Sequence, residues 1–220
     1  TNEQALEAAI EKALTGTCLE ELGNGFNVVA EPQEIVSEPV ELYRGGNGFY
    51  IGTANDYNAQ YAIDELRFWH FLESTQKDEL DKLKRTADWK LKIVERLDRM
   101  IKKYGLLRLL RKGLEVGDAH FTLLYQVPMA SSSQVVKDNF EKNEFSVTRQ
   151  VRYNTENQRE EMDMVVFVNG LPIATLELKN AWTGQTAKVH GIKQYKYDRD
   201  IKQPLLNFGR CLVHFAVDTD

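Results

Sequence analysis

The sequence predicts a mixed α/β domain, with a central sheet, helices on its faces and a helical insertion at about residues 57–115. Two apolar runs separated by Asn169-Gly170 give the strongest short-range signal for a β-hairpin. Amphipathic helical patterns occur at the N-terminus and within the insertion. A helical stretch at 186–199 separates this hairpin from a last apolar run, which favours a parallel crossover. We expect residues 1–220 to form a single domain, because this length is sufficient for one ordinary core.

The composition excludes several classes of protein. The formal charge of −5 argues against a chain that binds nucleic acid tightly through its general surface, but allows a nuclease domain to which another domain delivers DNA. Two cysteines, Cys18 and Cys211, form neither a metal motif nor a disulfide framework. No run of 18 apolar residues and no secretory signal is present, so we expect a cytoplasmic protein without a membrane segment.

The first element is an amphipathic helix over residues 2–14. Leu6, Ile10 and Ala13 follow helical spacing, with Leu14 beside them. Glu7 lies along the same helix. Two interpretations of Glu7 stay open at this point, a solvated helix face and an additional acidic residue of a metal site. Short strands are then expected at 26–29 and 40–43.

The helical insertion contains a long amphipathic helix that starts after Asp88. Leu91, Val94, Leu97 and Ile101 are predicted to point inward, and Gly105 is a plausible C-cap. Residues 77–112 carry 13 Lys or Arg and 6 Asp or Glu, an excess of +7. The basic segment is either a surface that faces phosphate or a partner, or a solvated helix face.

The remaining elements alternate between strands and helices. Alternating apolar residues predict strands at 120–127 and 145–153, with a short helix at 135–141 between them. The hairpin follows at about 163–168 and 173–179. The helix at 186–199 and a buried strand at 211–217 complete the sheet.

Charged residues on the hairpin determine the predicted site. Glu177 and Lys179 are two apart on a strand and therefore share one face, while Leu176 and Leu178 point to the other. A regular two-residue turn would place Asp163 opposite Leu176, on the wrong face. We therefore expect an offset turn or a β-bulge that brings Asp163 opposite Glu177.

Two carboxylates and one ammonium on one sheet face have a specific chemistry. Neighbouring carboxylates repel unless a cation lies between them, and ligand sets made only of oxygen favour Mg²⁺. A lysine beside them can orient the attacking water or offset charge on a phosphate. The alternative is a structural Glu–Lys pair. Under the metal-site interpretation, removal of either carboxylate should not unfold the domain.

The motif and its surroundings resemble a known family. Asp163 followed by Glu177-Leu178-Lys179 resembles the PD-(D/E)XK nuclease motif. Four segments resemble the N-terminal part of the restriction subunit of type I restriction-modification enzymes, namely FVNGLPIATLELKN (167–180), WTGQT (182–186), QYKYDRD (194–200) and CLVHFAVDTD (211–220). Upstream, DYNAQYAID (56–64), FLESTQ (71–76) and KYGLLRLLRKG (103–113) resemble the same group.

The resemblance implies a PD-(D/E)XK core and Mg²⁺-dependent cleavage of DNA. Asp163, Glu177 and the backbone carbonyl of Leu178 would hold the metal, with Lys179 as the catalytic lysine. Gln194 would be the glutamine of the Q-x-x-x-Y motif. The fifth position of that motif is Asp198 in place of tyrosine, so the role of Asp198 stays open.

Partners also follow from the resemblance. Family members act on double-stranded DNA together with modification and specificity subunits, and ATP is used only by motor domains that follow the nuclease part. The DNA target sequence is set by another subunit. Two alternatives remain, a docking arm without catalysis and a stand-alone PD-(D/E)XK nuclease.

Overall fold

The computed structural model describes residues 3–23, 44–45, 48–157, 159–179 and 184–218. In this part of the chain the α-helices are α1 (Glu3–Thr15), α2 (Leu19–Gly23), α3 (Glu65–Thr75), α4 (Lys77–Leu83), α5 (Trp89–Tyr104), α6 (Leu106–Lys112) and α7 (Gln134–Glu141). The strands are β1 (Arg44–Gly45), β2 (Phe49–Ile51), β3 (Tyr57–Asn58), β4 (Ile63–Asp64), β5 (Leu114–Val116), β6 (Ala119–Phe121), β7 (Phe145–Arg152), β8 (Glu161–Val168), β9 (Leu171–Lys179) and β10 (Val213–Asp218). The short helices are η1 (Ala54–Asp56), η3 (Ala187–Gly191), η4 (Gln194–Asp198) and η5 (Pro204–Leu206).

A mixed sheet forms the centre of the molecule, as predicted. Its order is β1-β2-β7-β8-β9-β10. β2 pairs with β7 in parallel and β9 with β10 in parallel, while β7, β8 and β9 form an antiparallel meander. The crossover between β9 and β10 contains η3 and η4, which confirms the predicted parallel connection.

Helix α1 covers one face of the sheet. Its residues Leu6, Ile10 and Leu14 pack against a cluster that contains Val147, Met164 and Leu178. The prediction of Leu6 and Ile10 as core residues is thus confirmed, but Ala13 is exposed and Leu14 takes its place. The crossover helix lies over the opposite face, because Gly191 of η3 approaches Ala216 and the Lys179 side chain.

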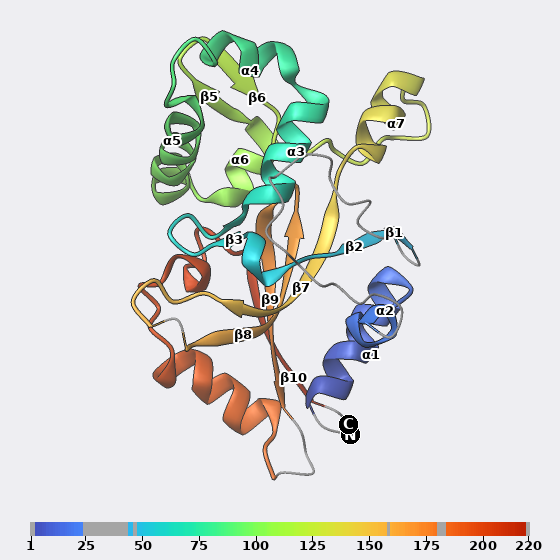
Figure 1. Ribbon diagram of the computed structural model, residues 1–220, viewed down its shortest axis with the longest axis vertical. Coiled ribbons are helices and arrows are strands. Elements are labelled where there is room, and N and C mark those ends of the chain that lie inside the picture. Colours follow the sequence, from blue (N-terminus) through green and yellow to red (C-terminus); the bar gives the residue numbers. More distant parts are fainter. Residues whose placement is uncertain (1–2, 24–43, 46–47, 158, 180–183, 219–220) are drawn as a thin grey trace.

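The helices α3 to α6 gather at one end of the sheet (Figure 1). They confirm the helical prediction for the insertion, and α5 starts after Asp88 and ends at Gly105 as expected. Its buried positions are Ile93, Val94, Leu97 and Ile101. The prediction that Leu91 points inward is therefore wrong, because Leu91 is exposed.

Other elements differ from the prediction in length. The strand predicted at 120–127 is only Ala119–Phe121, paired with β5 in a separate two-stranded sheet. The strands predicted at 26–29 and 40–43 lie outside the described residues. Within the described helices, none is long and apolar enough to cross a membrane.

Candidate active site

A two-residue turn and a β-bulge together set the register of the central hairpin. Asn169 and Gly170 have φ values of 50° and 76°, the left-handed conformation that two-residue hairpin turns require. Val168 therefore pairs directly with Leu171. The register then shifts by one residue, and Ile173 is the extra residue in β9.

The bulge brings the predicted carboxylates together. Beyond it Met164 pairs with Leu176, so Asp163 and Glu177 are the next positions along the two strands. A regular ladder after the same turn would have placed Asp163 opposite Leu176. The offset expected from the sequence is thus present, and it arises from a bulge at Ile173.

The strands β8 and β9 separate at this point. Their ladder ends at Met164 and Leu176, while β9 continues beside β10 as far as Lys179. The carboxylate of Asp163 occupies the opening, and its Oδ2 accepts a hydrogen bond of 2.7 Å from the backbone N–H of Leu178. A side chain therefore replaces a backbone partner where the sheet opens.

Glu177 is buried between two cations. Its exposed fraction is 1%, and that of Lys179 is 7%. Lys179 Nζ donates to Glu177 Oε1 at 2.8 Å, and the guanidinium of Arg199 donates to Glu177 Oε2. Both carboxylate oxygens are therefore engaged, as an ionised carboxylate requires when it is removed from water.

The pKa of Asp163 is raised to about 7. Burial is the main cause, and the negative charge of Glu177 is the second. The hydrogen bond from Leu178 and the charge of Lys179 act in the opposite direction. A further cation beside Asp163 would favour its ionised form.

The crossover helix contributes two side chains that the sequence did not indicate. The Tyr195 hydroxyl lies 2.9 Å from Oγ1 of Thr175, which is two residues before Glu177 on β9. The guanidinium of Arg199 binds Glu177 itself. Both η3 and η4 are π-helical, so more than 3.6 residues form each turn. The side of the crossover helix that faces the sheet therefore contains every fourth residue, namely Ala187, Gly191, Tyr195 and Arg199.

Gln194 and Asp198 lie away from these contacts. Gln194 is half-buried, and in the described part of the chain no hydrogen bond joins its amide to Asp163, Glu177 or Lys179. Asp198 is exposed. A regular α-helix after Ala187 would have turned Gln194 inward, and the wider helix moves that place to Tyr195. The catalytic role of Gln194 stays a prediction.

Arg199 is held by more than its ion pair. Its guanidinium carbon lies 5.1 Å from the centroid of the Tyr153 ring, and only 9% of the residue is exposed. Burial by itself would lower the pKa of Arg199, but the charge of Glu177 and the contact with the Tyr153 hydroxyl raise it. Arg199 is therefore a fixed cation beside Glu177. Arg199 lies in the segment QYKYDRD (194–200). Nothing in that segment predicts that its arginine binds Glu177, which is 22 residues upstream.

Glu7 belongs to a different network on the α1 face. It is buried, and its carboxylate accepts a hydrogen bond of 2.8 Å from Arg149 Nε and another from Gln150. The solvated interpretation of Glu7 is therefore wrong. Its carboxylate contributes to the raised pKa of Asp163 only as the last of several causes.

The oxygen donors at the hairpin fit a small divalent cation. Among the described residues, no group of three or more His, Cys, Asp or Glu side chains is arranged to hold a metal. Mg²⁺ does not need one, since it commonly takes one or two carboxylates and completes its shell with water and phosphate. Asp163, Glu177 and a backbone carbonyl would be a protein contribution of that kind.

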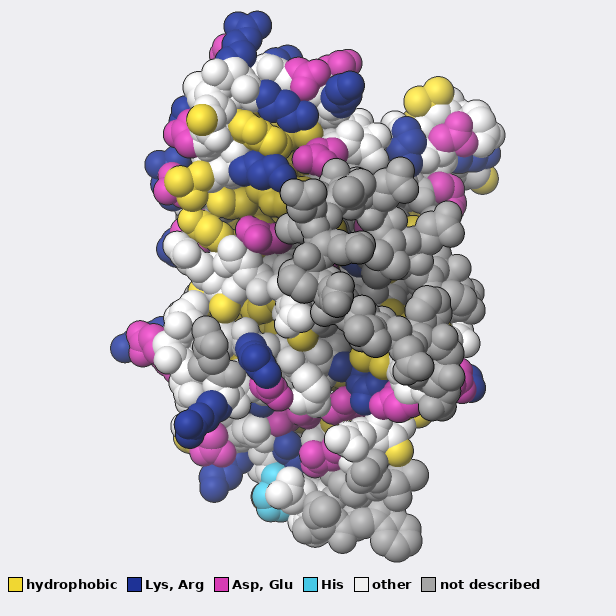
Figure 2. Space-filling view, in the orientation of Figure 1, with side chains coloured by type: hydrophobic (Ala, Val, Ile, Leu, Met, Phe, Trp, Pro, Cys, Tyr) yellow, Lys and Arg dark blue, Asp and Glu magenta, His cyan; other side chains and the backbone are white. Residues whose placement is uncertain are grey.

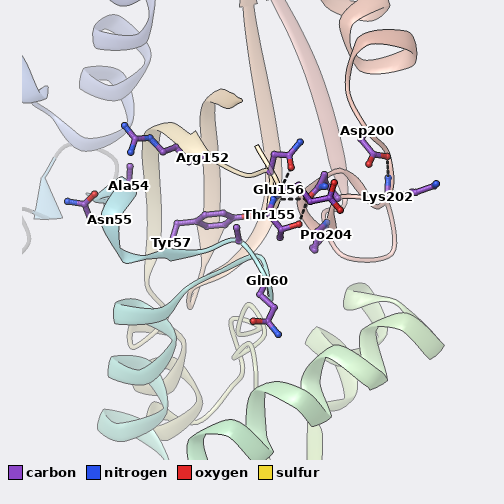
Figure 3. A pocket seen from close by; sticks show the side chains of 13 residues that line it. Ala54, Asn55, Tyr57, Gln60, Arg152, Thr155, Glu156, Asp200, Lys202 and Pro204 are labelled. Carbon is purple, nitrogen blue, oxygen red and sulfur yellow. Dashed lines mark hydrogen bonds between the residues drawn. The ribbon is translucent and has the colours of Figure 1, made fainter. Parts of the chain in front are cut away.

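A polar groove of about 780 Å³ adjoins the Tyr153–Arg199 pair. Its walls come from residues 54–60, 152–156 and 200–204. Figure 3 shows Arg152 and Lys202 on opposite sides of the groove, with the Tyr57 ring between them. The groove shares two chain segments with the site, because Tyr153 follows Arg152 and Arg199 precedes Asp200.

The basic segment 77–112 is partly neutralised within itself. Lys82, Lys92 and Lys102 pair with acidic residues one helical turn away, at 2.6, 3.0 and 2.8 Å. Near the end of α5 the cations instead flank an aromatic ring, with Lys103 Nζ and the Arg108 guanidinium 4.9 and 4.5 Å from the Tyr104 centroid. Figure 2 shows Lys and Arg side chains spread among acidic and apolar ones over this helical end. Both interpretations of the segment stay open.

Comparisons with known proteins give a consistent result. The family described as type I restriction enzyme R protein N terminus matches residues 55–220. A protein from Methanocaldococcus jannaschii, described as a type I restriction enzyme MjaIXP endonuclease subunit, is 50% identical over 54 residues. That match spans 23% of this chain and 5% of the relative's length. No solved structure matches the chain.

Proposed function

Because this chain belongs to the family of type I restriction enzyme R-protein N termini, we propose that it is the Mg²⁺-dependent DNA endonuclease domain of such a subunit. We further propose that its sheet is a PD-(D/E)XK core. The mixed α/β architecture with flanking helices is compatible with that core. The reaction would be hydrolysis of a DNA phosphodiester bond.

One observation carries this proposal. The bulge at Ile173 brings Asp163 beside Glu177, while strand alternation places Lys179 on the same face as Glu177. A bulge interrupts the ladder and is usually retained for a local purpose. Here it converts a hairpin with the carboxylates on opposite faces into one with a paired acidic site.

The metal ligands would be Asp163, Glu177 and the backbone carbonyl of Leu178. The N–H and C=O groups of one strand residue point toward the same neighbouring strand. Since the Leu178 N–H points at Asp163, its carbonyl faces the same opening between β8 and β9. All three donors are oxygen atoms, which Mg²⁺ prefers.

Each side chain has a separate task in this proposal. When bound, Mg²⁺ would offset negative charge on the phosphate and activate water. Asp163, whose pKa is raised to about 7, would have to release its proton to solvent in order to serve as a ligand. Lys179 positions the attacking water or offsets charge on the phosphate, and Gln194 orients the lysine or contacts the backbone phosphate.

The whole enzyme is a further part of the proposal. The chain spans about 5% of the length of the curated relative that it matches. We propose that ATP-driven motor domains elsewhere in the R subunit bring double-stranded DNA to this domain. Modification and specificity subunits would complete the complex and direct cleavage to unmodified foreign DNA.

A docking arm without catalysis is the second candidate. The observation that favours it is the complete neutralisation of Glu177 by Lys179 and Arg199, as in a structural ion-pair network. The raised pKa of Asp163 favours the nuclease, since carboxyl groups shifted by burial and by a neighbouring charge cluster at functional sites. A stand-alone PD-(D/E)XK nuclease is disfavoured by membership of the R-protein family.

The test combines Mn²⁺ titration with DNA cleavage in the assembled enzyme. Lys179→Ala should lower the cleavage rate about 10²–10³-fold, because it removes one preorganised electrostatic contact, and should still bind the metal. Lys179→Arg should rescue poorly, since a guanidinium is planar and cannot release its proton. Asp163→Asn should lose both metal binding and cleavage, while ATP hydrolysis continues.

Lys196→Ala is the matched control, because Lys196 is an exposed lysine on the crossover helix. It should cleave at the normal rate. Full activity in Lys179→Ala, or no Mn²⁺ binding in the unmodified protein either with or without DNA, would leave the docking arm as the better description.

A further inference from the structure

Lys179 and Arg199 occupy both oxygen atoms of Glu177, one of the proposed metal ligands. A metal ligated by Glu177 needs at least one carboxylate oxygen, and both are bound by positive groups. Lys179 is two residues from Glu177 on the same rigid strand. Arg199 lies after the end of η4, so it is the cation that can leave without breaking the sheet.

Arg199 has a donor still unused. Its Nε is buried and has no hydrogen-bond partner in the described part of the chain. A buried donor without a partner costs free energy, so a ligand that accepts a hydrogen bond from Arg199 Nε would stabilise this arginine. A phosphate can accept two parallel hydrogen bonds from one guanidinium, which a single Glu177 oxygen does not do here.

The adjoining groove offers a second unused donor. Gln203 Oε1 accepts from the N–H and the hydroxyl of Thr155 at 2.9 and 3.0 Å. Gln203 is over nine-tenths buried and lines the groove, and in the described residues its NH₂ group donates to nothing. Asn154 also lines the groove but is already engaged, because its Oδ1 accepts from two backbone N–H groups and its side chain hydrogen-bonds the Glu160 carboxylate. The groove therefore presents the Gln203 amide to a ligand rich in acceptors.

The charges of the groove balance one another. Arg152 and Lys202 are matched by Glu156 and Asp200. An anionic strand in the groove would thus bring charge that the lining does not offset, and nucleic acid needs such compensation. Arg199 precedes Asp200 of the groove wall in the chain and is a buried cation that would supply it.

We propose that this groove holds the phosphodiester backbone of DNA, and that Arg199 exchanges Glu177 for a DNA phosphate. The exchange frees Glu177 for the metal, so DNA opens the metal site. Without DNA the Arg199–Glu177 pair keeps the site from binding metal tightly. Arg199 is thus a positioning residue for Glu177, and the inference rests on the proposed nuclease function.

Linkage gives the measurable consequence. If DNA removes a cation that competes for Glu177, DNA raises the metal affinity, and the metal raises the DNA affinity by the same factor. Couplings of this kind are typically about 5–150-fold. Ordinary bridging of a phosphate by the metal also gives coupling, so the variant at Arg199 has to distinguish the two.

The experiment is calorimetric titration of Mn²⁺ into the chain, with and without a short DNA duplex. Arg199→Met keeps most of the side-chain volume and removes the charge. It should bind Mn²⁺ without DNA at least about fivefold more tightly than the unmodified chain. Adding DNA should then raise its Mn²⁺ affinity by a smaller factor than in the unmodified chain. Gln203→Glu keeps the oxygen that accepts from Thr155 and replaces the unused donor by an anion, so it should weaken DNA binding and reduce the gain in Mn²⁺ affinity on adding DNA. Lys196→Ala, with the same loss of charge at an exposed position, should behave as the unmodified chain.

The outcomes separate two failures. If the unmodified chain and Arg199→Met bind Mn²⁺ equally tightly without DNA, or if the duplex leaves the Mn²⁺ affinity of the unmodified chain unchanged, the exchange at Arg199 is refuted while the metal site stands. If neither protein binds Mn²⁺ in any condition, the nuclease proposal itself fails. Thermal unfolding identifies a variant that is merely unfolded. If Arg199→Met is unfolded, Arg199→Gln takes its place, because it also removes the charge and should show the same gain in Mn²⁺ affinity without DNA.

Discussion

Asp163 and Glu177 are neighbouring carboxylates in opposite environments. Glu177 is compensated by two cations, whereas Asp163 has a backbone N–H as its partner and a pKa raised to about 7. From the sequence, removal of either was expected to be tolerated. The contacts change that expectation, because only Asp163 is under electrostatic strain.

Asp163→Asn should stabilise the metal-free chain in a pH-dependent way. Between pH 3.8 and about 7 the folded chain retains a proton that the unfolded chain has lost. The free energy of unfolding therefore falls as the pH rises through this window and levels off above it. The asparagine variant has no titrating group at this position, so its free energy of unfolding does not fall in this window. By pH 8 it should be more stable than the unmodified chain by on the order of 2–4 kcal/mol. Urea denaturation from pH 4 to 8 measures the difference, and a constant difference would contradict the raised pKa.

Glu177→Ala should destabilise the chain instead. It leaves Lys179 and Arg199 buried without their anion, and breaking a buried pair in this way costs about 3–5 kcal/mol. Glu161→Ala on the neighbouring strand is the control, because its pair with Arg152 is solvent-exposed and contributes about 1 kcal/mol at most. Equal losses in urea denaturation would show that the two cations find other partners.

At the scale of elements, the hairpin and the crossover helix position the site. The hairpin tip is fixed in place because Gly170 contacts the start of α3, and its carbonyl accepts a hydrogen bond of 2.9 Å from Asp64 N–H. The crossover helix approaches β9 and β10 through Gly191. Both close approaches depend on a glycine, so the site is sensitive to side chains at these contacts.

Gly170→Ala should disrupt the hairpin tip. A methyl group there would lie 2.5 Å from Asp64 O and from Phe68 N, in addition to the cost of about 1–2 kcal/mol for a left-handed alanine. Gly184→Ala is the matched control, since Gly184 has φ +74° and nothing within 4 Å of the added methyl group. The loss in unfolding free energy should be at least about twice as large for Gly170→Ala as for the control. Equal losses would mean that the hairpin tip is free to move away from α3.

At the scale of the whole molecule, one core joins the helical end to the sheet. The same buried cluster contains Leu97 of α5, Phe68 and Phe71 of α3, and Val168 and Leu171 of the hairpin. The helices thus pack directly on the strands that carry the site. We expect the helical end and the sheet to unfold together.

Leu97→Ala tests this expectation. Leu97 is fully buried, so the cavity should cost about 2–5 kcal/mol. Hydrogen exchange should speed up in peptides of β8 and β9 as well as in α5. The control is Leu91→Ala on the same helix, where 48% of the side chain is exposed and the effect should be within about 0.5 kcal/mol. Faster exchange confined to the helices would contradict a shared core.

Local sequence determined much of the fold and part of the candidate site. Alternating apolar residues predicted β7, and the two apolar runs on either side of Asn169-Gly170 predicted β8 and β9. Helical spacing predicted α1 and α5, because side-chain periodicity is a property of the chain itself. The requirement that Asp163 and Glu177 share a face was enough to predict a bulge or an offset turn. Leu91 and Ala13 were misassigned, since periodicity alone cannot tell which edge of an apolar stripe meets a partner.

Only the tertiary structure decided what surrounds the two carboxylates. The sequence does not reveal that the crossover helix is π-helical, a geometry that turns Tyr195 and Arg199 inward in place of Gln194. Nor does it reveal that Glu7 meets Arg149 from 142 residues away. Such pairings depend on how distant elements pack, and packing also sets the burial that raises the pKa of Asp163. The chain thus encodes the site's carboxylates and lysine locally, while the fold determines the raised pKa of Asp163 and places Arg199 against Glu177.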